Sequence, residues 1–276
     1  MKIFKLPFKE YVEPPRGEGF LRLCSNENLF VPKNLINKLL SEASKLIDGR
    51  IYPEAYGGFL KGELARYLGV SEEMLYIGNG SDEVIRVLCA VFLRGPAKRV
   101  VTLEPTFSMY EHAAKLFNGL VVKVHLNPED YSLKLEPLLK EVKREDTALA
   151  FICNPNNPTG NQFPKDEVLE IVENAKCPVV VDEAYADFAE YNLLKQVEEY
   201  ENLIILRTFS KAWGLAGFRV GYTVARPEVP PALRAVSEPF NVSSISQAVC
   251  VAALRRNYVK RVVEEVKKER AFLGEQ

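Results

Sequence analysis

Short apolar runs alternate with longer amphipathic segments through most of the chain. The runs are rich in valine, isoleucine and leucine, which is typical of strands buried on both faces of a sheet. The expected strands occupy residues 99–103, 121–126, 147–152, 178–182 and 203–207. The expected helices between them include residues 106–117, 135–143 and 165–174. This alternation predicts an α/β fold, with a mainly parallel sheet covered by helices on both faces.

The pattern changes toward the carboxyl end. Residues from Gly217 to Ala225 form one more strand pattern, and this strand can run antiparallel to the others. The segment from Pro227 to Pro231 predicts a turn. From Ser244 to the end, the charge pattern predicts one long helix.

The composition excludes several classes of protein. The chain has 276 residues, a net charge of −1 and an isoelectric point of about 6.3, so it lacks the basic footprint of a nucleic-acid-binding protein. No apolar run reaches membrane-spanning length, and Met1–Pro7 lacks the features of a signal peptide. We therefore expect a cytoplasmic protein with no membrane partner. Because the five cysteines have no paired spacing and the two histidines are isolated, we expect no metal site.

Lys211 lies in the most informative stretch of the sequence. It follows Thr208 and Ser210 at the end of the apolar run 203–206, and three glycines and Arg219 come soon after it. Hydroxyl groups and an arginine can hold a phosphate, while glycines let the backbone approach a ligand closely. A lysine beside apolar groups and another cation loses its proton easily and can form a Schiff base. The alternative interpretation is an exposed loop lysine.

Asp182 ends the β-branched run that begins at Val179. Ligands of open α/β sheets bind beyond the carboxyl ends of the strands, so a carboxylate here can meet a ligand. It can instead cap the next helix. A nucleotide hydrolase also carries an acid at a strand end, but the required G-x-x-x-x-G-K-[ST] loop is absent from the sequence.

Two other segments carry polar groups next to expected strands or helices. Asn154–Gly160 contains two prolines, three asparagines and a glycine, which predicts a rigid turn that presents Asn157 to a ligand. The Asn157–Pro158 bond is a candidate for the cis form. Gly78–Glu83 opens an apolar helix, with Ser81 or Asp82 as the expected N-cap, and its glycines free backbone N–H groups for an anion. An ordinary capped helix is the alternative for that segment.

Together these segments resemble the fold-type I pyridoxal-phosphate aminotransferases, and within them the histidinol-phosphate aminotransferases. The motifs that carry the resemblance run in the order found in that family, from residue 25 to about residue 245. They are Ser25–Asn28, Tyr52–Glu54, Gly78–Glu83, Glu104–Tyr110, Asn154–Gly160, Val181–Tyr185 and Ser210–Gly221. The resemblance implies a mainly parallel, seven-stranded type of sheet, a pyridoxal 5'-phosphate cofactor, small-molecule substrates and a homodimer.

The resemblance also implies roles for individual residues. Lys211 carries the cofactor as a Schiff base and moves a proton, and Asp182 keeps the pyridine nitrogen protonated. Asn157 and Tyr185 bind the phenolic oxygen of the ring, and Phe107 stacks on the ring face. The phosphate is expected to be held by Gly80, Ser81, Asp82, Ser210 and Arg219. Tyr52 is expected to reach the phosphate from the partner subunit and, with Asn157, to contact substrate.

The sequence departs from the family pattern at two places. In the family, the last helix leads into a small carboxyl-terminal domain whose arginine binds the substrate carboxylate, and no residue here matches that arginine. Leu29 follows Asn28, where the family usually has proline. The expected organisation is an N-terminal arm and first helix (1–44), a cofactor-binding large domain (45–243), and a helix (244–276) leading to an incomplete small domain.

The expected reaction is amino transfer between L-histidinol phosphate and 2-oxoglutarate in histidine biosynthesis. A related threonine-phosphate decarboxylase has the same cofactor motifs and remains an alternative. A non-catalytic homologue that binds the cofactor without turnover is the other alternative.

Overall fold

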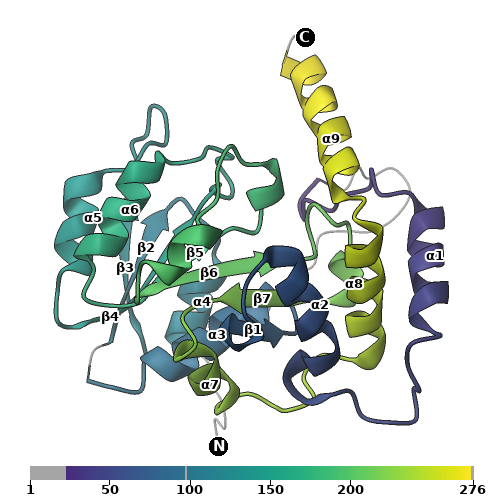
Figure 1. Ribbon diagram of the computed structural model, residues 1–276. Helices are drawn as coiled ribbons and strands as arrows, with labels where there is room; N and C mark the ends of the chain where they lie inside the picture. Colours follow the sequence, from purple (N-terminus) through teal and green to yellow (C-terminus); the bar gives the residue numbers. More distant parts are fainter. Residues whose placement is uncertain (1–22, 97, 275–276) are drawn as a thin grey trace, which may run out of the picture.

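Seven strands form one sheet in the computed structural model, which describes residues 23–96 and 98–274 (Figure 1). The strand order is β1-β7-β6-β5-β4-β2-β3. The strands are β1 Leu75–Gly78, β2 Arg99–Glu104, β3 Leu120–His125, β4 Thr147–Cys153, β5 Val179–Asp182, β6 Leu203–Thr208 and β7 Gly221–Val224. The five strands expected from the apolar runs are confirmed, whereas the short β1 has no counterpart among them.

The sheet is mixed, with β7 running against its neighbours. The neighbouring pairs from β6 to β3 are all parallel, whereas β7 pairs antiparallel with both β1 and β6. The antiparallel strand expected after Gly217 is therefore confirmed, although it begins only at Gly221. Residues Ala216–Phe218 instead form a 3-10 helix, and Arg219 has a positive φ of 53°. This tight connection returns the chain to the same end of the sheet, so Lys211 and Arg219 both lie there.

Helices cover both faces of the sheet. They are α1 Lys33–Ala43, α2 Gly58–Leu68, α3 Ser81–Phe92, α4 Met109–Leu116, α5 Leu135–Val142, α6 Lys165–Asn174, α7 Val229–Arg234, α8 Ser244–Arg256 and α9 Val259–Gly274. One apolar core contains buried residues of α3, α4 and α7, and the other contains residues of the remaining helices. Along β5, Val179 and Val181 belong to one core and Val180 to the other, as the alternation of side chains in a strand requires. The sheet therefore lies between two helical layers (Figure 1).

The single long helix expected from Ser244 is wrong. The chain forms two helices, because Asn257 adopts a left-handed conformation (φ 45°) and its N–H group bonds to the carbonyl oxygen of Ala253. The first of them, α8, is buried over most of its length. The second, α9, buries only Val259, Val262 and Val263 and then extends away from the body of the molecule (Figure 1).

Two expectations about helix starts also need correction. The helix expected from residue 106 begins at Met109, so Phe107 lies in the loop before it. The N-cap of α3 is Gly80, and neither Ser81 nor Asp82 caps it, because both already have helical positions. None of the helices described here is long and apolar enough to cross a membrane. The expected N-terminal arm lies mostly outside the described residues, as does the Met1–Pro7 segment.

Candidate active site

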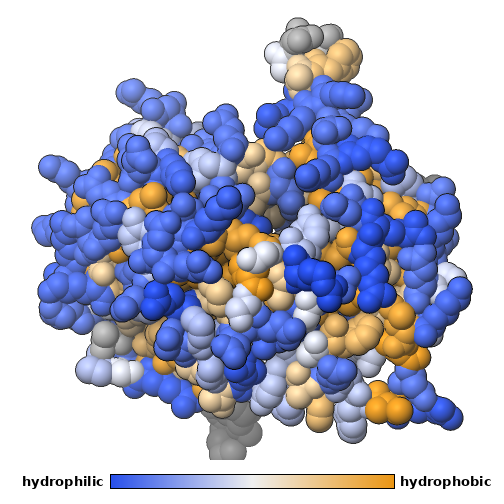
Figure 2. Space-filling view, viewed as in Figure 1, coloured by the Kyte–Doolittle hydropathy of each residue, from blue (hydrophilic) through white to orange (hydrophobic). Residues whose placement is uncertain are grey.

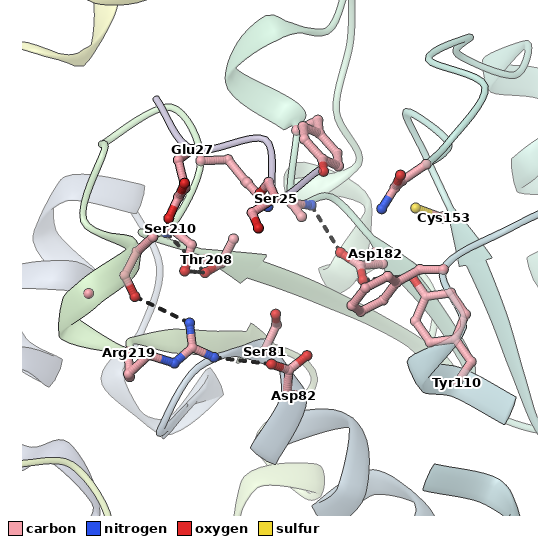
Figure 3. A pocket seen from close by; sticks show the side chains of 17 residues that line it. Ser25, Glu27, Ser81, Asp82, Tyr110, Cys153, Asp182, Thr208, Ser210 and Arg219 are labelled. Atoms are coloured by element: carbon pink, nitrogen blue, oxygen red, sulfur yellow. Dashed lines mark hydrogen bonds and ion pairs between the residues drawn. The ribbon is translucent and has the colours of Figure 1, made fainter. Parts of the chain in front are cut away.

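The carboxyl ends of β4, β5 and β6 open onto a cavity of about 420 Å³. Asp182 ends β5, Asn157 follows β4, and Lys211 follows β6, and all three line this cavity. Parallel strands end at the same edge of a sheet, so residues far apart in the sequence meet there. Figure 3 shows Arg219 and Asp82 on one side of the cavity, with Asp182 and Tyr110 on the other.

One side of the cavity is suited to an anion. Ser81 and Asp82 begin α3, where the first N–H groups of a helix lack partners within the helix. The Arg219 guanidinium lies beside them and its Nη2 is 3.1 Å from Oδ2 of Asp82. Ser210 is buried at the same end of the cavity, and its hydroxyl accepts a hydrogen bond from Thr208 at 2.9 Å. Arginine, hydroxyl and helix N–H groups together are suited to a phosphate group, and we call Arg219, Ser210 and the start of α3 (Ser81 and Asp82) the phosphate seat.

Two glycines are required for this arrangement. Gly80 has a φ of 80°, and a Cβ atom there would lie 2.4 Å from Nη2 of Arg219. Gly221 begins β7, and a Cβ atom there would lie 2.4 Å from the backbone nitrogen of Ser81. A side chain at Gly221 would clash with fixed backbone, and one at Gly80 would strain the positive-φ backbone and displace Arg219, so both glycines pack directly against the phosphate seat.

Asp182 is a buried carboxylate for which no direct ion pair is found among the described residues. Only 3% of the residue is exposed. Its Oδ2 accepts a hydrogen bond from the Tyr110 hydroxyl at 2.7 Å, and its Oδ1 accepts one from the Ala184 N–H group at 3.0 Å. Burial raises the pKa of Asp182 to about 6, although these two hydrogen bonds oppose the shift. The expectation that Asp182 caps the next helix is wrong, because the N-cap of the 3-10 helix Ala186–Phe188 is Tyr185; the Ala184 bond only closes the turn before it, and the Asp182 side chain lines the cavity.

Lys211 faces the same cavity from the loop after the neighbouring strand, β6. Its Nζ donates a hydrogen bond to the carbonyl oxygen of Ser25 at 2.8 Å. Burial lowers the pKa of Lys211, and Arg219 lowers it further, whereas Asp82 and Asp182 act against this. The neutral amine, which is the nucleophilic form, is therefore easier to reach than in an exposed lysine.

The asparagine-rich loop is held rigidly. Asn156 is buried, its Oδ1 accepts from the Thr106 hydroxyl at 2.9 Å, and its Nδ2 donates to the carbonyl oxygen of Pro105 at 3.1 Å. The expected cis bond between Asn157 and Pro158 is confirmed. The loop therefore presents Asn157 to the cavity, where Tyr185 lies as well. The Tyr185 hydroxyl accepts a hydrogen bond from Nδ2 of Asn26 at 3.0 Å.

A buried ion pair supports the segment that carries Asp182 and Tyr185. Glu183 is only 2% exposed, and its Oε2 accepts from Nε and Nη2 of Arg207 at 2.9 and 2.7 Å. The other oxygen, Oε1, accepts from the Leu193 N–H group at 2.6 Å. Burial raises the pKa of Glu183, and Arg207 opposes this shift. The pair fixes the backbone between Asp182 and Tyr185 to the neighbouring strand.

We expect Arg207→Leu to destabilise the protein by about 3–5 kcal/mol, because it leaves the Glu183 carboxylate buried without its cation. Urea denaturation measures this change. Arg255→Leu is the matched control, since it removes an exposed ion pair with Glu63 and should cost less than about 1 kcal/mol. Equal effects of the two substitutions would contradict the structural role of Glu183 and Arg207.

The structure brings most of the predicted site residues together. Those that line the cavity are Ser81, Asp82, Phe107, Asn157, Asp182, Tyr185, Ser210, Lys211 and Arg219. Gly80 lies against Arg219 without lining the cavity. Tyr52 lies apart from them, is 79% exposed and stacks on Phe240 with ring centroids 4.9 Å apart. Its predicted contact with the phosphate therefore requires a second subunit.

Sequence reasoning gave no role to several residues that line the cavity, among them Ser25, Tyr110 and Cys153. Tyr110 has a signal that could have revealed it, because it lies on the apolar face of α4 with Ala113 and Ala114. A tyrosine on such a face usually directs its hydroxyl to a buried partner, which here is Asp182. Ser25 contributes a backbone carbonyl group to Lys211, and no side-chain pattern predicts such a contact.

The fold and this cavity define an enzyme of the fold-type I aminotransferase class. Residues 18–276 match the family model described as aminotransferase class I and II. The histidinol-phosphate aminotransferase of Thermoanaerobacter pseudethanolicus is 36% identical over 252 residues, which are 91% of this chain and 71% of that protein. The chain belongs to the aminotransferase class I and II family, and it is a pyridoxal-phosphate-dependent enzyme.

Solved structures with a similar fold include an aminotransferase and a decarboxylase. Histidinol-phosphate aminotransferase from Sinorhizobium meliloti, in complex with pyridoxal-5'-phosphate, has a TM-score of 0.82 and 31% identity, covering 91% of this chain and 68% of that one. L-threonine-O-3-phosphate decarboxylase from Porphyromonas gingivalis has a TM-score of 0.70 and 23% identity, covering 82% of this chain and 66% of that one. The second similarity is one of fold alone.

The residues of the cavity fit pyridoxal phosphate. The phosphate seat supplies an arginine, a serine and a helix N-terminus for the phosphate group. Asp182 is a buried carboxylate with no direct ion pair among the described residues, so a protonated ring nitrogen would compensate its charge. Lys211 supplies an amine whose pKa is lowered by burial. The cofactor thus satisfies groups that the polypeptide alone leaves uncompensated.

Proposed function

We propose that the enzyme transfers an amino group between L-histidinol phosphate and 2-oxoglutarate, in the cytoplasm and as a homodimer. The observation that carries the proposal is the convergence of Lys211, Asp182 and the phosphate seat in a chain that is 36% identical to a histidinol-phosphate aminotransferase. This reaction is a step of histidine biosynthesis.

Bound pyridoxal phosphate supplies an electron sink that stabilises negative charge on the reacting carbon of the substrate. The side chains of the enzyme would hold and transfer protons and would orient the cofactor. Asp182 holds a proton on the ring nitrogen, because its buried carboxylate is most stable beside a positive charge. The Nζ of Lys211 would hold the cofactor through a Schiff base, and as a free amine it would take a proton from the substrate carbon and return it.

Orientation of the cofactor comes from the walls of the cavity. Arg219, Ser210 and the start of α3, which line the cavity, would hold the phosphate, and the Asn157 amide and the Tyr185 hydroxyl would bind the ring oxygen. Phe107, which also lines the cavity, would pack against the ring face. Because these groups lie on five different segments, they fix the ring in one orientation relative to Lys211.

A half-reaction assay tests the proposed reaction. We expect mixing with L-histidinol phosphate to bleach the visible absorbance of the loaded enzyme, and 2-oxoglutarate to restore it with formation of glutamate. A threonine-phosphate decarboxylase would instead release carbon dioxide from threonine phosphate. Retained yellow protein with no exchange or release in either assay would favour the non-catalytic alternative.

The homodimer is supported by apolar groups exposed around Tyr52. Ile51 and Phe240 are also exposed, by 66% and 45%, and lie in the same region as Tyr52. Exposed apolar clusters of this kind are typical of protein interfaces. A second copy of the chain, seated here with twofold symmetry, would receive the Tyr52 hydroxyl at its own phosphate seat.

We expect inactive Lys211→Ala and Tyr52→Ala chains to complement each other when they are mixed and allowed to exchange subunits. In a random mixture half of the dimers are hybrids, and each hybrid has one of its two sites intact. Activity should therefore return to about one quarter of the wild-type level. Light scattering that finds a fully active monomer would contradict the shared site.

A further inference from the structure

A second cavity, of about 240 Å³, adjoins the Lys211 cavity. Asn157 and Tyr185 line both cavities and form the wall between them. On its far side the second cavity is lined by Val266, Lys267 and Arg270 of α9. The rest of the lining comes from Asn26, Pro155, Asn156, Pro158, Gly160 and Phe188. A substrate whose amine meets the cofactor at Lys211 would therefore have the second cavity beside it.

The apolar stripe of α9 fixes which of its residues face this space. Val259, Val262 and Val263 are buried in the core, and Val266 continues the stripe one turn further on. Lys267 and Arg270 are spaced three residues apart, so they lie on one side of the helix beside the stripe. Their position therefore follows from the packing of α9.

The second cavity has a positive charge and no carboxylate in its lining. Neither Lys267 nor Arg270 forms an ion pair with a carboxylate of the described residues. The side chain of Asn157, which lies across the cavity from them, forms no hydrogen bond within residues 23–96 and 98–274. Two cations and an amide donor that face one small space are suited to a phosphate or carboxylate group.

We propose that Lys267 and Arg270 bind the anionic end of the substrate, namely the phosphate monoester of the amino donor or the distal carboxylate of the oxo acid. This assignment rests on the proposed function, since it requires a substrate that carries an anion beyond its reacting carbon. Such a subsite favours charged substrates over neutral ones of the same shape. Figure 2 shows hydrophilic surface where α9 meets the body of the molecule, and Arg270 is exposed, so an anion can reach this side of the cavity from solvent.

The test is calorimetric binding to the cofactor-loaded protein. The probes are glycerol 3-phosphate and maleate, which carry the two candidate anions but no amine, so binding stops before any transfer. Glycerol is the neutral control. We expect the double variant Lys267→Gln, Arg270→Gln to bind at least one probe roughly tenfold or more weakly than wild type, as expected for lost charged hydrogen bonds. The probe for which the double variant loses affinity identifies which anion, phosphate or carboxylate, binds at the subsite.

Lys268→Gln is the matched control, because Lys268 is exposed on the same helix and does not line the cavity. It should leave both dissociation constants unchanged. Wild-type affinity in the double variant, or equal loss in the control, would overturn the subsite and leave the proposed reaction standing. If only the double variant loses affinity for a probe, the subsite is supported. If, in addition, the wild-type enzyme takes no amino group from L-histidinol phosphate, the subsite stands but the proposed donor is overturned.

Discussion

Lys211→Ala should abolish the covalent attachment of pyridoxal phosphate and, with it, transamination. Among the residues of the cavity, Lys211 alone has an amine, and burial lowers its pKa toward the nucleophilic form. Borohydride reduction of the loaded wild-type enzyme should fix the pyridoxyl group on the peptide that contains Lys211. The variant should bind the cofactor without covalent attachment, because its phosphate seat is intact.

Lys61→Ala is the control for this experiment. Burial also lowers the pKa of Lys61, but this residue lies on α2 and does not line the cavity. It should retain full labelling and full activity. Recovery of the label on any lysine other than Lys211 would contradict the assignment.

Asp182→Asn should bind the cofactor but slow the half-reaction with an amino donor by at least roughly a hundredfold. A neutral amide cannot hold a proton on the ring nitrogen, so the electron sink is weakened. Rapid mixing with L-histidinol phosphate measures the rate. Asp187→Asn makes the same chemical change five residues further on, outside the cavity, and should have little effect on the rate. A near-normal rate in Asp182→Asn would mean that Asp182 only closes the following turn.

The same substitution has a second expected effect, on the stability of the cofactor-free protein. The folded state raises the pKa of Asp182 from an ordinary 3.8 to about 6, so the folded state binds the proton more tightly than the unfolded state. The ionised carboxylate therefore lowers the free energy of unfolding, and this effect is complete above the folded-state pKa of about 6. The effect disappears as the pH falls below the ordinary pKa of 3.8. At pH 7.5 the variant should be more stable than wild type by roughly 2–3 kcal/mol. Urea denaturation at pH 7.5 and pH 5 should show the difference shrinking at the lower pH.

The sequence could predict the positions of the site residues that follow the strand ends. The apolar runs are short and β-branched, so their ends are clear, and the rule that parallel strands end at one edge places Asn157, Asp182 and Lys211 together. The seat at the start of α3 was predictable for a similar reason, since glycines before an apolar helix indicate free N–H groups. The roles given to these residues remain predictions that the variants above test.

Other features depend on tertiary packing and left weaker signals. The break at Asn257 follows two arginines in the last turn of α8, which is an available stop signal, but the charged pattern continues across it. The partner of Tyr110 is 72 residues away and was not visible in local patterning. The break at Asn257 sets the direction of α9 and so places Lys267 and Arg270 beside the second cavity. The sequence, which predicted one continuous helix, could not show which residues lie near these two cations.

Gly221 shows how a residue without a side chain can limit what this active site tolerates. Its backbone fits against Ser81 with no room for even one methyl group. An alanine there would push β7 and the start of α3 apart and so spread the donors that hold the phosphate. Substitutions of Gly221 should therefore be tolerated as poorly as substitutions of Lys211, although Gly221 offers the cofactor no functional group. Searches that rank positions by chemical reactivity alone would overlook it.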